Sequence, residues 1–159
     1  MPINKKHVGF VGWRGMVGSV LMSRMSQLND FDNINPVFFT TSQKGKIANI
    51  NNCEYVLNDA FDIDTLSKLD IIVTCQGSEY SHNTLPKLRS NGWNGFWIDA
   101  ASEYRMDQDS IIVLDPINST DIRKAMNNGT KNFIGGNCTV SLMMLAVHGL
   151  LKANLIKTI

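Results

Sequence analysis

The chain has 159 residues, of which 43% are hydrophobic and 18% are charged, and its formal net charge is +1 at pH 7. This length suits about one domain on the usual prior of roughly 150 residues. The composition is that of a globular protein. A near-neutral charge with scattered lysines and arginines argues against a nucleic acid or an anionic membrane as a partner.

Targeting and metal signals are weak. The apolar N-terminus is interrupted by glycines and by Arg14, so it lacks the apolar core of a signal peptide. No apolar run is long enough to span a bilayer. Cys53, Cys75 and Cys138 are odd in number and lack metal-ligand spacing. We therefore expect reduced thiols, a cytoplasmic protein and no metal site.

Strand and helix patterns alternate along the chain. Strands are expected at 7–11, 36–40, 70–75, 95–100 and 110–114, and helices at 16–28, 78–90, 120–128 and 139–151. A short helix capped by Asp62 or Asp64 should run to Leu69, and residues 42–52 should form a polar loop. The alternation predicts an α/β fold: a doubly wound, mostly parallel Rossmann-type sheet with helices on both faces.

Local signals sharpen these expectations. Asn91-Gly92 and Gly129 should end their helices. The run 70–75 is rich in β-branched residues, as in a strand buried on both faces. The helix at 139–151 is apolar on several sides and should be buried, while residues 155–159 form a strand-like apolar run after Asn154.

A glycine-rich loop follows the first strand. Gly9, Gly12, Gly15 and Gly18 precede a helix, in a spacing that departs from the usual dinucleotide fingerprint. Glycines in this setting let the backbone approach a pyrophosphate at the helix N-terminus. Simple turn chemistry is the alternative, and the following helix favours nucleotide binding.

The end of the second strand bears on which nucleotide binds. NAD-specific folds place an acidic residue there, which would repel the 2′-phosphate of NADP. Here the chain reads Thr40-Thr41-Ser42-Gln43-Lys44, and Arg14 adds a cation in the glycine loop. A solvated polar loop would explain each residue alone, but together they predict NADP as the cofactor.

Cys138 stands at the start of the last helix, after Gly135-Gly136-Asn137. The positive end of a helix dipole favours the thiolate form of a cysteine, and the N–H groups beside Asn137 and Cys138 could hold an oxyanion. An inert buried thiol is the alternative. With NADP nearby, the pattern predicts a nucleophile that carries an acyl group as a thioester during hydride transfer.

Several segments together resemble one family. They are GFVGWRGMVGSVLMSRM, PVFFTTSQ, DIIVTCQG, GWNGFWIDAAS, LDPIN and FIGGNCTVSLMM. From about His7 to Leu151 they resemble the N-terminal, cofactor-binding part of bacterial aspartate-semialdehyde dehydrogenase, in its Gram-negative form. The resemblance implies an oxidoreductase that reduces 4-phospho-L-aspartate to L-aspartate 4-semialdehyde with NADPH. It also implies a place in the biosynthesis of lysine, threonine, methionine and diaminopimelate.

The resemblance also assigns residues. It places NADP contacts at Gly12, Arg14, Gly15, Met16, Val17, Thr41, Ser42 and Gln76. It makes Cys138 the catalytic nucleophile, with Asn137 beside it, and Arg105 the ligand of the substrate phosphate. A planar guanidinium suits a phosphate, but Glu103 two residues earlier would weaken anion binding unless it points away. His7, His82 and His148 fall on no motif and are expected to be structural or surface residues.

In the family, a second half supplies a substrate-binding domain, most of a homodimer interface, the general base and a carboxylate-binding arginine. The resemblance therefore implies that residues 1–159 are an NADP-binding domain with the nucleophile-bearing helix start, cut from a longer chain and inactive alone. Two alternatives stay open. One is a related acyl-phosphate reductase of the N-acetyl-glutamyl-phosphate reductase type, and the other is a non-catalytic NADP-binding remnant.

Overall fold

The computed structural model describes residues 5–156. Within them, seven strands form one sheet in the order β5-β2-β1-β6-β7-β9-β8, and every neighbouring pair is parallel. The strands are β1 (Lys6–Val11), β2 (Ile34–Thr40), β5 (Asn58–Asp59), β6 (Ile71–Thr74), β7 (Phe96–Asp99), β8 (Ser110–Val113) and β9 (Asn132–Gly135). The predicted doubly wound α/β fold is confirmed.

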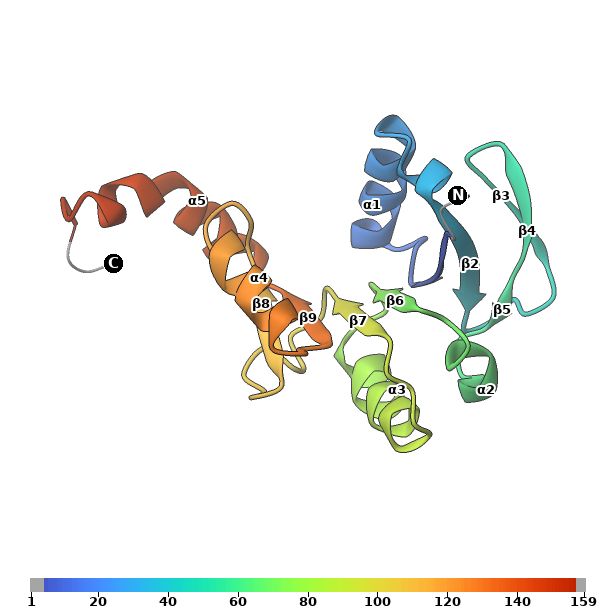
Figure 1. Cartoon of the computed structure of the whole chain (residues 1–159). Helices are drawn as coiled ribbons and strands as arrows, with labels where there is room; N and C mark the ends of the chain where they lie inside the picture. The colour runs from blue at the N-terminus through green and yellow to red at the C-terminus, as the bar shows by residue number, and fades with distance from the viewer. Residues whose placement is uncertain (1–4, 157–159) are drawn as a thin grey trace.

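Helices cover both faces of the sheet. They are α1 (Met16–Gln27), η1 (Asp30–Asn33), α2 (Ile63–Leu66), α3 (Ser78–Ser90), α4 (Ser119–Asn127) and α5 (Cys138–Lys152). Figure 1 shows α1 above the sheet and α2 and α3 below it. Alternate strand residues therefore enter two cores: Phe10 packs in a cluster with Met22 of α1, and Ile72 in a cluster with Leu88 of α3.

The predicted helix ends follow their local signals. Gly92 and Gly129 adopt φ values of 80° and 88° directly after α3 and α4, a left-handed conformation that glycine adopts without a steric cost. The Asp62 side chain accepts a hydrogen bond from the Thr65 N–H at 3.2 Å and so caps α2. That helix ends at Leu66, earlier than the expected Leu69.

Residues 42–52 are not simply a polar loop. β3 (Ile47–Ile50) pairs antiparallel with β4 (Cys53–Val56) in a hairpin. Asn51 and Asn52 form the turn with φ values of 52° and 61°, the left-handed pair that a two-residue hairpin turn requires. Tyr55 packs edge-on against Phe38 with ring centroids 4.8 Å apart, which anchors the hairpin to the sheet.

β9 was not predicted from the sequence. It has four residues and ends in glycine, so its apolar pattern is too short to stand out. Its position matters because it lies between β7 and β8 and leads into the loop before Cys138. Phe133 and Ile134 are buried there, which fixes the start of that loop.

One face of the sheet is open between α1 and α4. A groove of about 550 Å³ lies there, with Val17 and Leu21 of α1 on one side and Ile122 and Met126 of α4 on the other. Ile71 and Val73 on its floor are only half-buried, whereas Ile72 on the other face is fully buried. The expectation that residues 70–75 are buried on both faces is therefore wrong for the α1 side.

The expected burial of the last helix is also wrong. None of the α5 side chains is buried within the described part of the chain, and Leu142 is 69% exposed. Both figures show α5 extending beyond the sheet. The reason is topological, since α5 leads away from the carboxyl end of β9, the last strand but one of the sheet, and no described element buries its side chains. Asn154 ends the helix with φ 56°, and the strand-like run predicted at 155–159 lies largely outside the described residues.

Candidate nucleotide pocket and thiol site

A pocket of about 360 Å³ lies at the carboxyl ends of β1, β2 and β6. The chain order reverses between β1 and β6, because β1 pairs with β2 on one side and β6 on the other. Doubly wound folds bind ligands at this switch point. The pocket is lined by Gly12, Trp13, Arg14, Gly15, Phe39, Thr40, Thr41, Cys75 and Gln76.

Two glycines make the floor of this pocket possible. Gly12 has φ 71°, and a Cβ there would lie 2.6 Å from the Gln76 nitrogen. A Cβ at Gly18 would lie 2.3 Å from the Gly12 carbonyl oxygen. Both distances are far inside van der Waals contact. The glycine spacing is therefore required to pack α1 against the turn and the turn against the loop after β6.

The N-terminus of α1 faces this loop without a side chain to cap it. Gly15 is the N-cap residue, no side chain accepts a hydrogen bond from the first turn, and that turn carries no acidic residue. The first N–H groups of a helix lack intrahelical partners. Those at the start of α1 can therefore donate hydrogen bonds to an anion. The Met16 and Val17 side chains do not line the pocket, and only their backbone N–H groups could contribute.

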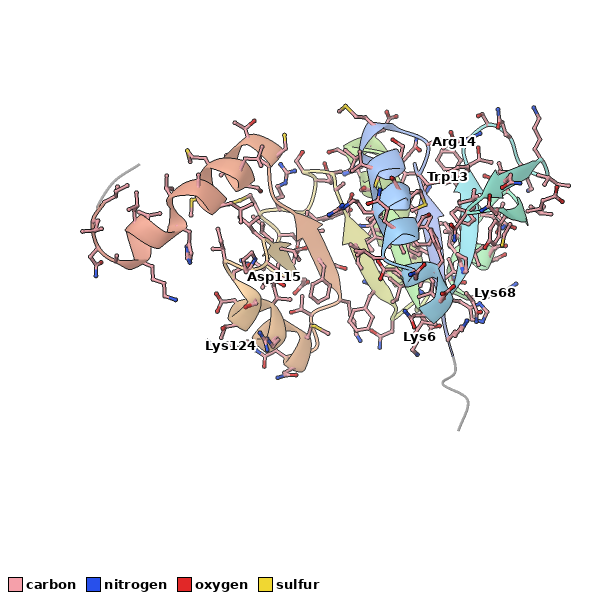
Figure 2. All side chains as sticks on the ribbon, turned by 90° about the horizontal axis from the view of Figure 1, so that it is seen from above. Lys6, Trp13, Arg14, Lys68, Asp115 and Lys124 are labelled. Atoms are coloured by element: carbon pink, nitrogen blue, oxygen red, sulfur yellow. The ribbon has the colours of Figure 1, made fainter. Side chains whose placement is uncertain are left out.

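Arg14 is held over the pocket by three neighbours. Its Nη2 donates to Thr40 Oγ1 at 2.9 Å, its Nη1 donates to the Gln43 side chain, and its guanidinium lies 5.0 Å from the Trp13 ring centroid. Figure 2 shows Trp13 and Arg14 together beside the start of α1. The Trp13 indole is itself fixed, since its Nε1–H donates to the Phe39 carbonyl at 3.1 Å.

Thr40 is the residue that sequence reasoning left unassigned here. Its Oγ1 accepts hydrogen bonds from Arg14 and from the Ser42 and Gln43 N–H groups. It thereby shapes the turn that carries Thr41 and Ser42. Thr41 lines the pocket and Ser42 is exposed beside it. The signal was visible as a strand-ending threonine, which often bonds the backbone two residues on.

Lys44, the second cation that the sequence places near the end of the second strand, does not line the pocket. The Lys44 ammonium lies 3.6 Å from the Asp59 carboxylate, and Asp59 pairs with Thr40 across β2 and β5. Lys44 therefore offsets the one carboxylate that lies beside Thr40 in the sheet. Arg14, and not Lys44, is the cation that lines the pocket.

Cys75 and Gln76 follow β6, on the side of the pocket opposite Thr40. Burial raises the pKa of the Cys75 thiol, and the nearby Asp99 carboxylate raises it further. Cys75 is thus a neutral packing residue at neutral pH. Gln76 is exposed at the pocket edge, where its amide can reach a ligand.

Cys138 begins α5, and its side chain is exposed. The Asn137 side chain accepts a hydrogen bond from the Val140 N–H at 3.1 Å, so Asn137 is the N-cap. The Thr139 hydroxyl lies 4.0 Å from the Cys138 sulfur. The first turn of α5 contains no acidic residue. The thiol therefore lies at the positive end of a capped helix and is open to an electrophile.

Arg105 connects this thiol site to the sheet. Its Nε donates to the Gly135 carbonyl at 2.8 Å, and its Nη2 lies 3.4 Å from the Ala100 carbonyl. A guanidinium has five N–H donors, so N–H groups remain beyond these two contacts. Arg105 is half-buried and stands close to the loop that leads to Cys138.

The described residues contain neither a metal-binding cluster nor a membrane-spanning helix. Across residues 5–156, no cluster of three or more His, Cys, Asp or Glu side chains is placed to hold a metal ion. No helix described there has both the length and the apolarity to cross a bilayer.

The fold and pocket define a dinucleotide-binding domain, and comparisons give its family. The family model described as "Semialdehyde dehydrogenase, NAD binding domain" matches residues 7–125. The chain belongs to this family.

An aspartate semialdehyde dehydrogenase from Francisella tularensis is 56% identical, with a TM-score of 0.88, over 94% of this chain and 41% of that chain. The chain thus spans less than half the length of that relative.

More distant structures share the fold. An aspartate semialdehyde dehydrogenase II from Vibrio cholerae, complexed with ASA, is 21% identical with a TM-score of 0.74, over 94% of this chain and 47% of that chain. An aspartate semialdehyde dehydrogenase with NADP from Candida albicans is 14% identical with a TM-score of 0.63, over 94% and 47% of the two chains. At these identities the comparisons support the doubly wound architecture alone.

Proposed function

We propose that this chain is the NADP-binding, nucleophile-bearing part of a phosphorylating aspartate-semialdehyde dehydrogenase. The reaction is the reduction of 4-phospho-L-aspartate to L-aspartate 4-semialdehyde, which feeds lysine, threonine, methionine and diaminopimelate synthesis in the cytoplasm. The observation that carries the proposal is that a dinucleotide pocket and a capped helix start that presents Cys138 both follow the carboxyl ends of strands in one parallel sheet. The 56% identity to the Francisella tularensis enzyme supports the substrate class.

The pocket residues fit NADP better than NAD. The Arg14 guanidinium is fixed between Thr40 and Gln43, and Thr41 adds a hydroxyl at the pocket wall. A 2′-phosphate adds negative charge that a guanidinium binds with two hydrogen bonds. The α1 N-terminus and the Gly12 turn would hold the pyrophosphate. NADPH supplies the hydride when it is bound.

The roles of the other residues follow from their places. The Cys138 thiolate would attack the acyl carbon and phosphate would leave, so that the acyl group is held as a thioester on the sulfur. The N–H groups of the first turn of α5, which Asn137 caps, would stabilise the oxyanion that forms on the carbonyl. Arg105 would bind the departing phosphate through the N–H groups not directed at Gly135 and Ala100.

A complete active site needs groups beyond this set. A general base and a clamp for the substrate carboxylate are proposed to come from a second, substrate-binding domain, and the full-length protein is proposed to be a homodimer. The isolated 159 residues should therefore bind NADP weakly and turn over nothing measurable.

A chimera tests the proposal. This chain would be joined to the remaining part of the 56% identical Francisella tularensis enzyme, beyond the 41% that the chain matches. Phosphate-dependent formation of NADPH from L-aspartate 4-semialdehyde is expected, and Cys138→Ala should abolish it while NADP binding is retained. Steady turnover by the Cys138→Ala chimera would contradict the role of the thiol.

A non-catalytic NADP-binding module is the second candidate. It is favoured by the scarcity of polar partners at Cys138: among residues 5–156, Thr139 is the only hydrogen-bonding side chain found near the sulfur. An inactive chimera that still binds NADP would support this second candidate.

A further inference from the structure

The loop after β7 is fastened to the first turns of α3 by three contacts. Ser102 Oγ lies 3.3 Å from Ser78 Oγ, Glu103 Oε1 lies 2.7 Å from His82 Nδ1, and the Tyr104 hydroxyl lies 3.4 Å from the Ser81 carbonyl. The three α3 residues are Ser78, Ser81 and His82. They share one face of the helix, because residues three and four apart are neighbours.

These contacts join the two halves of the candidate site. α3 begins at Ser78, directly after Gln76 and Gly77 at the edge of the nucleotide pocket. The fastened loop continues into Arg105, whose Nε–H holds the Gly135 carbonyl three residues before Cys138. A shift of this loop on α3 would therefore move Arg105 relative to both the pocket and the thiol.

Glu103 raises an electrostatic problem at this place. Its carboxylate belongs to the same short loop as Arg105, and a free carboxylate so close would compete with an anion for the guanidinium. The hydrogen bond to His82 turns the Glu103 side chain toward α3. Tyr104 lies between Glu103 and Arg105 in the chain. It keeps its proton, because burial raises the pKa of its hydroxyl and the nearby Glu103 carboxylate raises it further.

The His82–Glu103 pair orients the Glu103 carboxylate more than it stabilises the fold. The His82 side chain is 68% exposed and that of Glu103 is 32% exposed. Exposed pairs contribute little to the folding free energy, because water screens the attraction between them. A contact of 2.7 Å between such side chains still restricts where the carboxylate points.

We propose that His82 is a positioning residue that holds the Glu103 carboxylate against α3 and so keeps Arg105 free to bind the phosphate group of the substrate. The proposal rests on the proposed phosphate-binding role of Arg105. It gives a function to a histidine whose place in the sequence suggested only a structural or surface role.

The test uses the whole 159-residue chain, labelled with ¹⁵N, and inorganic phosphate as the probe. Phosphate affinity is read from the Arg105 Nε–H and from the backbone amides of residues 135–138. His82→Ala should weaken phosphate binding by roughly threefold to fivefold, the scale of one exposed charge interaction. Glu103→Gln should bind at least as tightly as the wild type, and the double variant should regain wild-type affinity. His148→Ala, in α5, is the matched control and should change nothing.

The double variant decides the point. If the pair only stabilises the loop, Glu103→Gln and the double variant will both bind phosphate weakly, and the proposal is overturned. Unchanged affinity in His82→Ala overturns it as well. Arg105→Gln separates the two levels: if it binds phosphate as the wild type does, the role proposed for Arg105 fails, and the role of His82 fails with it. If Arg105→Gln loses binding while His82→Ala keeps it, only the role of His82 is wrong.

Discussion

The Arg105 side chain donates its Nε–H to the Gly135 carbonyl oxygen at 2.8 Å. One candidate ligand of the substrate is thus bonded to the strand that leads to Cys138. The same side chain also reaches the Ala100 carbonyl at the end of β7. Arg105 therefore ties β7 and β9 together at their carboxyl ends, where the site is assembled.

Replacing Arg105 by lysine should lower stability as well as phosphate binding. A lysine keeps the charge but cannot direct two fixed N–H groups at two carbonyls. Because the charge is kept and one hydrogen bond is lost, we expect the free energy of unfolding to fall by about 0.5–1.5 kcal/mol, the net contribution of a typical hydrogen bond. Urea unfolding measures the change. Arg24→Lys is the control, because Arg24 is exposed and its side chain bonds, among the described residues, only to Gln27 in the same helix. If the two variants are equally stable, the Arg105 bonds to the Gly135 and Ala100 carbonyls do not stabilise the fold.

Cys138 should react faster with iodoacetamide than Cys53. Both side chains are exposed, but Cys53 begins a strand of the hairpin and Cys138 begins a capped helix. The N–H groups at a helix N-terminus stabilise the negative charge that a sulfur carries as it attacks an electrophile. Mass spectrometry of peptides after short exposures compares the two sites within one sample. Faster labelling of Cys53 would mean that the helix start does not activate Cys138.

Adding a methyl group at Gly18 should disrupt the nucleotide loop. The Cβ of Gly18→Ala would lie 2.3 Å from the Gly12 carbonyl oxygen and 2.5 Å from Trp13 Cα. Overpacking of this kind costs about 1–3 kcal/mol, so the variant should melt earlier and lose NADP binding. Gly149→Ala is the matched control, because a Cβ there meets no atom within 4 Å. An unchanged melting temperature for Gly18→Ala would contradict the close packing of Gly18 against the Gly12 turn.

Much of this architecture follows from local patterns in the sequence. The switch from alternating to helical periodicity locates α1, and Asn91-Gly92 ends α3, because these signals depend only on neighbouring residues. β9 and the β3–β4 hairpin are missed, since their four-residue strands show little periodicity and gain stability from partners distant in the chain. The exposure of α5 was also unpredictable, because an apolar helix indicates burial without saying what covers it.

Local patterns in the sequence also located part of the candidate nucleotide pocket. Gly12 and Arg14 stand in a recognisable loop, and both line the pocket. Thr40 and His82 contact residues far along the chain, Arg14 and Glu103 respectively. No local spacing encodes such pairings, so they emerged only from the folded chain.

Asp70 should make stability depend on acid pH. The His7 N–H and the Lys6 ammonium donate to its carboxylate and hold the pKa of Asp70 below its ordinary value. The stabilisation is fully present above the ordinary carboxyl pKa of about 3.9 and is lost as pH falls through the lower folded-state pKa.

Asp70→Asn should therefore be less stable than wild type at neutral pH, by less than about 1 kcal/mol because the pair is exposed. That difference should vanish in strong acid. Urea unfolding at several pH values measures it, with Glu54→Gln as a control for loss of an exposed charge. A difference that grows toward acid pH would contradict this account.

The central claim is that the pocket after β1 binds NADP through Arg14. Titrating the chain with NADP and with NAD by calorimetry, and repeating both with Arg14→Ala, tests it most directly. We expect NADP to bind at least about tenfold more tightly than NAD, since a charged hydrogen-bonded contact contributes about 1.5–3 kcal/mol. Arg14→Ala should remove that preference and leave NAD binding nearly unchanged. Equal affinities of the wild-type chain for NADP and NAD, or a preference that survives the loss of Arg14, would contradict the claim.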